Sequence, residues 1–207
     1  MKQLRDIKNW QEMINEPICG DAIELMKKLP DKSVDLVLTD PPYPDYHQEI
    51  YKYKKGLLNG LKRFSCKQFI FWSSKVDFPL SYTAIHIWDK KVGVGSWYER
   101  IFERNGAIEY KVYRYYLINS SVAANYTHDN FWGHSSQKPI QLIEKLILEN
   151  SNKGDLILDP FMGSFTTAIA AESLERRWIG CDISEKYCQI GEERLKILRS
   201  QPKLFTP

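Results

Sequence analysis

The sequence lacks any uncharged apolar run long enough to cross a bilayer, and its first residues, MKQLRD, lack the apolar segment of a secretory signal. These two absences predict a cytoplasmic protein with no membrane partner. Cysteine is scarce, with no Cys-x-x-Cys pair and no histidine at ligand spacing, which argues against a zinc site or a disulfide framework. We therefore expect no bound metal and reduced, mostly buried thiols at Cys19, Cys66, Cys181 and Cys188.

A strong excess of one charge sign is also missing. The 207 residues carry a net charge of +3, with 43% hydrophobic and 27% charged residues, which is the balance of a soluble globular protein. The length predicts a single domain over residues 1–207. Within it, residues 73–135 are rich in aromatic side chains, and we expect them to complete a sheet and to form a small substrate-recognition region.

Basic residues gather in one short stretch, interleaved with tyrosines. A charge run is usually a solvated face. Beside a pocket of nucleobase size, such a run could instead hold nucleic-acid phosphates while the aromatic rings stack on bases. The predicted nucleic-acid contacts are Lys52, Lys54, Lys55, Lys62 and Arg63.

Short β-type runs alternate with helical stretches, which is the pattern of a parallel sheet covered by helices on both faces. Strands are expected at 17–19, 34–39, 68–72, 156–158 and 178–181, with later, antiparallel strands at 85–88 and 110–117. Helices are expected at 22–28, 140–150, 166–174 and 185–198. The sequence therefore predicts the α/β fold class.

The most informative motif follows the apolar run 34–39 and reads Asp40-Pro41-Pro42-Tyr43. Proline has a fixed φ and no N–H, and it holds the preceding residue extended, so the turn is stiff and rich in acceptors. The Asp40 carboxylate and the Pro41 carbonyl can each accept one N–H of an exocyclic amine, while the Tyr43 ring stacks on the base. Because such proline pairs are also ordinary turn formers, the motif alone leaves a purely structural role open.

A second constellation begins at the strand 156–158 and continues as Asp159-Pro160-Phe161-Met162-Gly163-Ser164 into a helix. A small-residue turn at the carboxyl edge of a parallel sheet lets a ligand approach the backbone closely. The next strand ends at Asp182, whose carboxylate can accept hydrogen bonds from two ribose hydroxyls. The turn has one glycine and no P-loop lysine, so a nucleoside without phosphates, such as S-adenosylmethionine, fits better. The alternative is a plain turn with Ser164 or Thr166 as the helix cap.

With both motifs in this order, the chain resembles the amino-group DNA methyltransferases that modify adenine N6 or cytosine N4, in the β arrangement where the catalytic motif precedes the cofactor motif. The resemblance covers 18–36, leading into the first motif, and 134–195, where Ser136-Gln137-Lys138-Pro139 also matches. It implies a Rossmann-like class I methyltransferase fold, with a mostly parallel seven-stranded sheet, one antiparallel strand and permuted motif order. It also implies S-adenosyl-L-methionine as cofactor, DNA as partner and, as in many relatives, a homodimer.

The resemblance assigns roles to individual residues. The catalytic residues it implies are Asp40, Pro41, Pro42 and Tyr43. The cofactor-binding residues it implies are Asp21, Lys138, Asp159, Phe161, Gly163, Ser164, Thr166 and Asp182. The target base would leave the duplex to reach this site, and hydrogen bonds to its amine would free the nitrogen lone pair for attack on the methyl group.

Two departures from the family pattern bear on activity. Relatives usually carry glycine at the position of Phe165, whose ring can either narrow the cofactor site or lean away from it. The region between the two motifs is also short for sequence recognition. The leading aspartate of the first motif favours adenine N6, because cytosine-N4 relatives more often begin it with serine. Alternatives are a cytosine-N4 or an RNA methyltransferase, or a catalytically weakened nucleic-acid-binding module.

Overall fold

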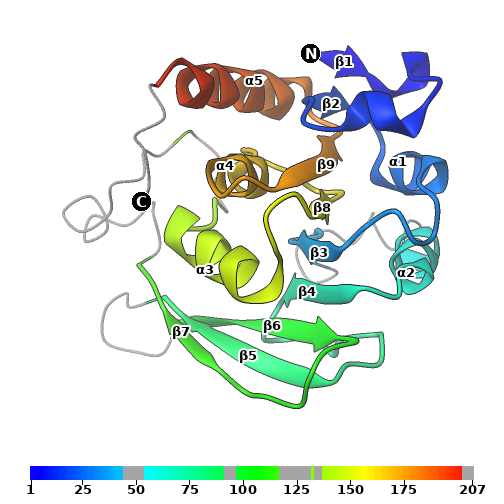
Figure 1. The fold of residues 1–207 in the computed structure, drawn as a ribbon. Helices are drawn as coiled ribbons and strands as arrows, with labels where there is room; N and C mark the ends of the chain where they lie inside the picture. Colours follow the sequence, from blue (N-terminus) through cyan, green and yellow to red (C-terminus); the bar gives the residue numbers. More distant parts are fainter. Residues whose placement is uncertain (44–53, 91–96, 117–131, 133–136, 202–207) are drawn as a thin grey trace.

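A nine-stranded sheet with helices on both faces forms the centre of the molecule (Figure 1). The computed structural model describes residues 1–43, 54–90, 97–116, 132 and 137–201. In these ranges the strands are β1 (Lys2–Gln3), β2 (Ile18–Cys19), β3 (Leu36–Thr39), β4 (Lys67–Trp72), β5 (Ala84–Asp89), β6 (Tyr98–Arg104), β7 (Val112–Arg114), β8 (Leu156–Asp159) and β9 (Arg177–Asp182). The helices are α1 (Ala22–Lys28), α2 (Lys54–Arg63), α3 (Ile140–Asn150), α4 (Thr166–Ser173) and α5 (Glu185–Ser200), with short 3-10 helices at Leu4–Asp6 and Trp10–Met13.

The strand order is β1-β2-β9-β8-β3-β4-β6-β5-β7. Among the strands that the structure describes, β6 alone runs antiparallel to its neighbours β4 and β5, and all other pairs are parallel. The α/β fold with one antiparallel strand is therefore confirmed. The count of seven strands is wrong for this sheet, because two very short edge strands, β1 and β7, extend it.

The expected strands and helices match the observed ones closely, but β1, β6 and α2 were not predicted. The strands predicted to be antiparallel at 85–88 and 110–117 are β5 and the shorter β7, and that orientation is wrong, because both run in the same direction as β4. The reversed strand is β6, whose charged sequence YERIFER does not indicate a buried strand. Its charges are paired inside the fold: Glu103 lies 2.8 Å from buried His86, and Arg104 donates to Gln68 at 2.7 Å. Of the four histidines, His86 thus has a structural role, and His47, His128 and His134 lie outside the described residues.

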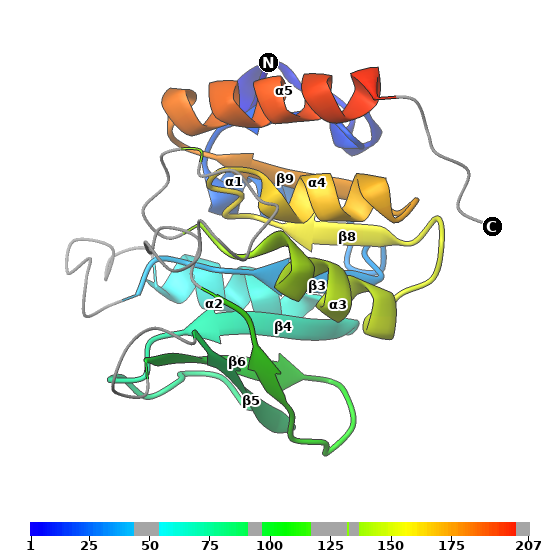
Figure 2. The ribbon, with the colours of Figure 1, turned by 90° about the vertical axis from the view of Figure 1, so that its left-hand side faces the viewer.

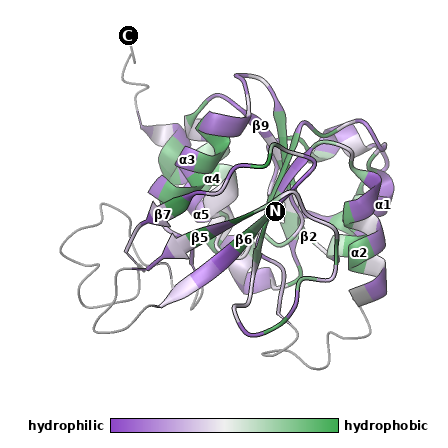
Figure 3. Ribbon diagram, turned by 90° about the horizontal axis from the view of Figure 1, so that it is seen from below, coloured by the Kyte–Doolittle hydropathy of each residue, from purple (hydrophilic) through white to green (hydrophobic). Residues whose placement is uncertain are grey.

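The two faces of the sheet carry separate apolar cores. Helices α3, α4 and α5 cover one face, while α1, α2 and the 3-10 helices cover the other, and Figure 3 shows the sheet between these two layers. Helix α3 forms as its pattern predicts, with Leu142, Ile143, Leu146 and Ile147 buried. All four cysteines are free, as expected, with three buried and Cys66 half-buried. In the described ranges no helix combines the length and apolar character needed to cross a membrane.

Helix α2 occupies part of the stretch that was interpreted as a basic surface. It packs closely on α1 because it carries glycines at the contact: a Cβ on Gly56 would lie 2.7 Å from Ile23, and one on Gly60 would lie 2.6 Å from Met26. Leu57 and Leu61 are buried in the core beneath it. The helix connects β3 to the parallel strand β4, so it runs back along the sheet and ends at the amino edge of the strands.

Candidate active site at the carboxyl ends of the strands

Two aspartate–proline turns end the adjacent parallel strands β3 and β8. The strands pair in register, with Val37 opposite Leu158, and the carboxyl ends of β8 and β9 point to the same side in Figure 2. The hydroxyl of Thr39, the residue before Asp40, donates a 2.8 Å hydrogen bond to Asp159. The two predicted motifs therefore lie side by side at one edge of the sheet.

The Asp40 carboxylate accepts hydrogen bonds on both of its oxygens. The Tyr43 hydroxyl donates to Oδ1, and the Lys138 ammonium donates to Oδ2. The Lys138 side chain is 8% exposed, and its ammonium lies 5.0 Å from the centre of the Phe71 ring. Lys138 was predicted to bind cofactor; its described contacts join the segment before α3 to the catalytic motif.

Two further charged residues complete this cluster, and neither was selected from the sequence. Glu99, on β6, lies 3.3 Å from the Lys138 ammonium, and Lys90, just after β5, donates to Glu99 at 2.5 Å. Burial disfavours the charged form of both Glu99 and Lys138. The ammonium groups of Lys138 and Lys90 nevertheless lower the pKa of Glu99. The carboxylates of Asp40 and Glu99 likewise raise the pKa of Lys138. Neither residue belongs to a motif; for Glu99 alone, a charged residue within a partly buried strand is a signal.

Tyr43 is held by the same cluster. Burial, then the nearby carboxylates of Asp40 and Glu99, raise the pKa of the Tyr43 phenol well above its ordinary value, so it remains a hydrogen-bond donor. Its ring centre lies 5.9 Å from that of Trp72, at an interplanar angle of 57°. The stacking of Tyr43 on a base stays a prediction.

Asp159 is buried and braces the second turn from within. Its Oδ1 accepts from Thr39 at 2.8 Å and from the Phe161 amide at 3.0 Å, and its Oδ2 accepts from Thr167 at 2.7 Å. Burial raises its pKa to about 6, although the two hydroxyls lower it. These contacts give Asp159 and the Phe161 amide a structural role, and the predicted contact of these two residues with cofactor stays a prediction.

Gly163 and Asp182 form the part of this edge best suited to a nucleoside. Asp182 Oδ2 accepts from the Gly163 amide at 3.0 Å, and Oδ1 accepts from the Ser184 amide at 2.8 Å. Burial raises the pKa of this carboxyl. Since a carboxylate offers about four lone-pair positions, these two amides leave capacity on both oxygens for two ribose hydroxyls.

Ser164 and Thr166 face helix α5 instead of an open ledge. Both are buried, and Arg194 of α5 donates to the Ser164 carbonyl at 2.5 Å and to the Thr166 hydroxyl at 3.1 Å. The Ser164 carbonyl and the Thr166 hydroxyl thus fix the loop to α5, and the predicted binding of cofactor by these two residues stays a prediction. Arg194 was not predicted, because nothing in the local sequence shows that α5 packs on this turn.

The Phe165 ring leans away from the turn. It is fully buried, with its ring centre 6.1 Å from that of Trp178, and a Cβ on Gly191 of α5 would lie 2.3 Å from it. The backbone at Phe165 has a left-handed conformation, with φ of 63°, which glycine adopts without strain. Of the two alternatives for this ring, the structure thus supports the one in which it does not narrow the site.

Asp21 also has a structural role. Its carboxylate caps α1, accepting from the amides of Ile23 at 2.9 Å and Glu24 at 3.0 Å. The preceding residue, Gly20, donates to the Asp182 carbonyl at 3.0 Å. Asp21 therefore lies at the edge of the predicted nucleoside site, with its side chain directed to the helix.

The predicted nucleic-acid residues are divided between the two ends of α2. Lys55 is exposed near the end that follows the catalytic motif, whereas Lys62 is exposed at the opposite, amino edge of the sheet. Arg63 differs from prediction: its guanidinium donates to the carbonyls of Met26 and Leu29 and pairs with Asp31 at 2.6 Å, so it clamps the end of α1. Lys52 and the Lys54 side chain lie outside the described part.

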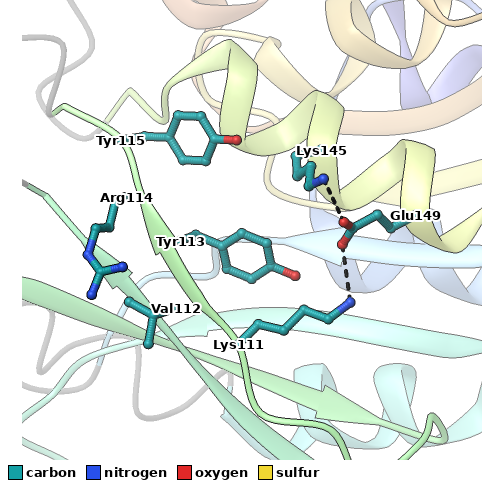
Figure 4. Close-up of a pocket in the computed structure, with 7 residues that line it drawn as sticks. All are labelled: Lys111, Val112, Tyr113, Arg114, Tyr115, Lys145 and Glu149. Atoms are coloured by element: carbon teal, nitrogen blue, oxygen red, sulfur yellow. Dashed lines mark hydrogen bonds and ion pairs between the residues drawn. The ribbon is translucent and has the colours of Figure 1, made fainter.

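A groove of about 420 Å³ lies elsewhere, between β7 and α3 (Figure 4). Glu149 on its wall pairs with Lys111 at 3.4 Å and with Lys145 at 2.8 Å. It contains none of the predicted site residues. Among the described residues, no group of three or more histidine, cysteine or acidic side chains is arranged to hold a metal.

Comparison with known proteins identifies the family of this chain. Residues 46–193 match a family model described as DNA methylase, N6_N4_Mtase. The type II methyltransferase M.HpaI of Haemophilus parainfluenzae is 28% identical over 86% of this chain and 73% of its own length. The DNA adenine methyltransferase YhdJ of Escherichia coli is 27% identical over 87% of this chain and 82% of its own.

Solved structures show the same fold. The cytosine-N4-specific PvuII DNA methyltransferase superposes with a TM-score of 0.67 at 15% identity, covering 92% of this chain and 87% of its own. A putative DNA modification methylase from Thermus thermophilus, complexed with S-adenosyl-L-methionine, gives 0.62 at 22% identity, covering 88% and 93%. With the family model spanning most of its length, this chain belongs to the DNA methylases that modify the amino group of adenine N6 or cytosine N4.

Proposed function

We propose that this protein transfers a methyl group from S-adenosylmethionine to the N6 amine of adenine in DNA. The observation that carries the proposal is the 2.8 Å hydrogen bond between Thr39 and Asp159. It supports an arrangement in which the amine-binding turn and the nucleoside-binding turn serve one reaction, since each follows one of the two bonded residues.

The nucleoside end of the site is assigned to Asp182 and Gly163. The Asp182 carboxylate has acceptor capacity for two ribose hydroxyls, and the buried Gly163, with φ of 50°, has no side chain to obstruct a ligand. S-adenosylmethionine, the methyl donor of this family, would supply there an activated methyl group on a sulfonium. The turn must then hold the ligand so that this methyl faces Asp40.

The target end is assigned to Asp40, Pro41, Pro42 and Tyr43. An amine on an aromatic base is a poor nucleophile because its lone pair is delocalised into the ring. When Asp40 and the Pro41 carbonyl each accept one of its hydrogens, the nitrogen moves toward tetrahedral geometry and its lone pair becomes available. Pro42 keeps this turn stiff, and catalysis then comes chiefly from position and hydrogen bonding.

The target base must leave the duplex to reach this edge. Swinging it out costs a few kcal/mol of stacking, which the Tyr43 ring and contacts with DNA phosphates would offset. We assign phosphate contacts to the basic residues that follow the catalytic motif most closely in the sequence, Lys52, Lys54 and Lys55. Lys62, at the far end of α2, is not part of this proposal.

Adenine is favoured over cytosine by the first residue of the catalytic motif, Asp40. The relatives include both kinds, since YhdJ is named an adenine enzyme and the PvuII enzyme is named cytosine-N4-specific. The chemistry at Asp40 and Pro41 is the same for either amine. The identity of the methylated base is therefore the finer point that an experiment must decide.

The test is transfer of a labelled methyl group to DNA, followed by digestion of the product to nucleosides. We expect label in N6-methyladenine with the wild-type protein and none with Asp40→Ala, provided that both bind S-adenosylmethionine equally in calorimetry. Label in N4-methylcytosine would overturn adenine specificity. Equal label with both proteins would overturn the role of Asp40.

A catalytically weakened DNA-binding protein is the second candidate. Its main argument was steric obstruction of the cofactor site by Phe165. The ring is buried against Trp178 and Gly191, so that argument loses its basis. DNA binding without any calorimetric signal for S-adenosylmethionine would favour this candidate over the enzyme.

A further inference from the structure

Glu99 is the least expected residue beside the candidate active site. It lies on β6, opposite Trp88 of β5, and its side chain is 15% exposed. Three side chains converge on it: Lys90 at 2.5 Å on Oε1, and Lys138 at 3.3 Å and the Tyr43 hydroxyl at 3.4 Å on Oε2. A buried carboxylate with this many partners has a defined orientation.

Lys138 is shared between two carboxylates. Its ammonium contacts Asp40 Oδ2 and Glu99 Oε2, and it lies over the Phe71 ring at 5.0 Å and the Trp88 ring at 5.8 Å. Two acids, Asp40 and Glu99, and two bases, Lys90 and Lys138, balance in this cluster. The Lys138 ammonium is thus fully compensated although its side chain is buried.

This sharing matters because the target amine needs Asp40. The Asp40 carboxylate accepts from Lys138 and Tyr43, so an incoming amine must compete with these donors. An ammonium that left Asp40 without another acceptor would be an unpaired buried charge, which is strongly unfavourable. Glu99 is the carboxylate already within 3.3 Å of that ammonium.

On the basis of the proposed function, we propose that Glu99 is a positioning residue for methyl transfer, giving the Lys138 ammonium its second acceptor when Asp40 binds the target amine. Lys90 holds Glu99 in place for this purpose. Glu99 therefore acts on the reaction through Lys138 and Tyr43, and it makes no contact with the reacting atoms.

The charge states agree with this role. Burial alone would lower the pKa of Lys138, yet Asp40 and Glu99 raise it above its ordinary value, so the ammonium persists. Burial alone would raise the pKa of Glu99, but Lys138 and Lys90 lower it below its ordinary value, so Glu99 stays an ionised carboxylate. Replacing Glu99 by glutamine keeps its shape and removes its charge.

Glu103 provides a matched control for this replacement. It is a buried glutamate four residues further along β6, paired with His86 and not with the Asp40 cluster. We expect Glu99→Gln to lower the single-turnover rate of methyl transfer by about tenfold to a hundredfold, with an unchanged dissociation constant for S-adenosylmethionine. Glu103→Gln should leave that rate within about twofold, even if its thermal midpoint falls.

A double-mutant cycle with Lys138→Met separates positioning from simple structural support. If Glu99 acts through Lys138, then Glu99→Gln causes no further loss of rate once Lys138 is replaced. The inference would be overturned if the rate losses of Glu99→Gln and Lys138→Met multiplied in the double variant, or if Glu99→Gln transferred methyl groups at the wild-type rate. Either result would leave the proposed function intact. A wild-type protein that transfers no methyl group at all would instead overturn the proposed function.

Discussion

The two aspartate–proline turns of the active edge have nearly the same local sequence and very different surroundings. Asp40 follows β3, is partly exposed and is bound by an ammonium and a phenol. Asp159 is the last residue of β8, is buried and is bound by two hydroxyls and one amide. The first carboxylate has a counter-charge, and the second has only neutral donors.

This difference explains how one local pattern serves two purposes. Neutral donors in a buried site fix the shape of a loop, but they compensate a charge poorly, and burial therefore raises the pKa of Asp159 to about 6. A carboxylate paired with a lysine keeps lone pairs for a substrate at an accessible edge. The strand and the proline set the position of each aspartate, and partners from distant segments set its role.

The largest expected effect distinguishes the two aspartates by activity. Asp40→Asn replaces one acceptor oxygen by a donor where the target amine must bind, so methyl transfer should fall by about a hundredfold to a thousandfold. Asp159→Asn should stay within about tenfold of wild type, because its oxygen can still accept from Thr39 and its amide can donate to the Thr167 hydroxyl. Single-turnover rates at saturating S-adenosylmethionine measure both variants.

An equal loss of activity in Asp40→Asn and Asp159→Asn would contradict the different roles of the two aspartates. Calorimetry with S-adenosylmethionine serves as the control, since neither replacement removes Asp182 or Gly163. If Asp159→Asn lost binding of S-adenosylmethionine while Asp40→Asn bound it normally, Asp159 would be shown to take part in cofactor binding.

A second difference between the turns lies in how their backbones are fixed. Prolines stiffen the turn after β3, whereas the turn after β8 depends on Phe165, held at φ of 63° by its buried ring. Phe165→Ala should lower the free energy of unfolding by about 3–5 kcal/mol. Phe165→Gly should lower it by roughly 1 kcal/mol less, because glycine adopts positive φ without strain. Urea unfolding of the two variants measures the difference.

Gly191→Ala tests the same contact from α5. In the wild-type protein the added methyl group meets the Phe165 ring, so about 1–3 kcal/mol of stability should be lost. In the Phe165→Gly background the space is open, and the change should be neutral or stabilising. Additive losses would contradict the packing described. Tighter S-adenosylmethionine binding by Phe165→Gly would show that the ring obstructs the site after all.

The pH dependence of stability should reflect Asp159. Burial raises its folded pKa from 3.8 to about 6, so the stability contributed by its protonated form is complete below about 3.8 and is lost as the pH rises through about 6. This shift corresponds to roughly 3 kcal/mol at most. Relative to wild type, Asp159→Asn should therefore gain free energy of unfolding across this range, as urea unfolding at a series of pH values would show.

A difference between Asp159→Asn and wild type that stayed constant over this pH range would contradict the raised pKa of Asp159. It would mean that the three donors to the Asp159 carboxylate compensate its charge more fully than burial opposes it.

The positions of the two turns could be predicted because their signal is local, whereas their partners from distant segments could not. Asp40 and Gly163 each follow a short apolar run that the sequence predicts to be a buried strand. Their location at one edge of the sheet could therefore be predicted. Glu99 and Arg194 could not be, since each acts on a turn more than twenty residues away and neither belongs to a motif. Arg63 was assigned to DNA because it lies in the basic stretch after the first motif, whereas its guanidinium donates to carbonyls at the end of α1.

The smallest expected effect concerns the bond that joins the two turns. Thr39→Val removes one donor to Asp159 Oδ1, which still accepts from the Phe161 amide, so about 1 kcal/mol of stability should be lost. Thr167→Val is the matched control: it removes the hydroxyl donor to Oδ2 and leaves the link to β3 intact. Thr167→Val should therefore cost at least as much stability, whereas Thr39→Val should lower the methyl-transfer rate more, by about threefold to tenfold. If the two variants changed the rate equally, the hydrogen bond between β3 and β8 would support the fold without aligning the two turns.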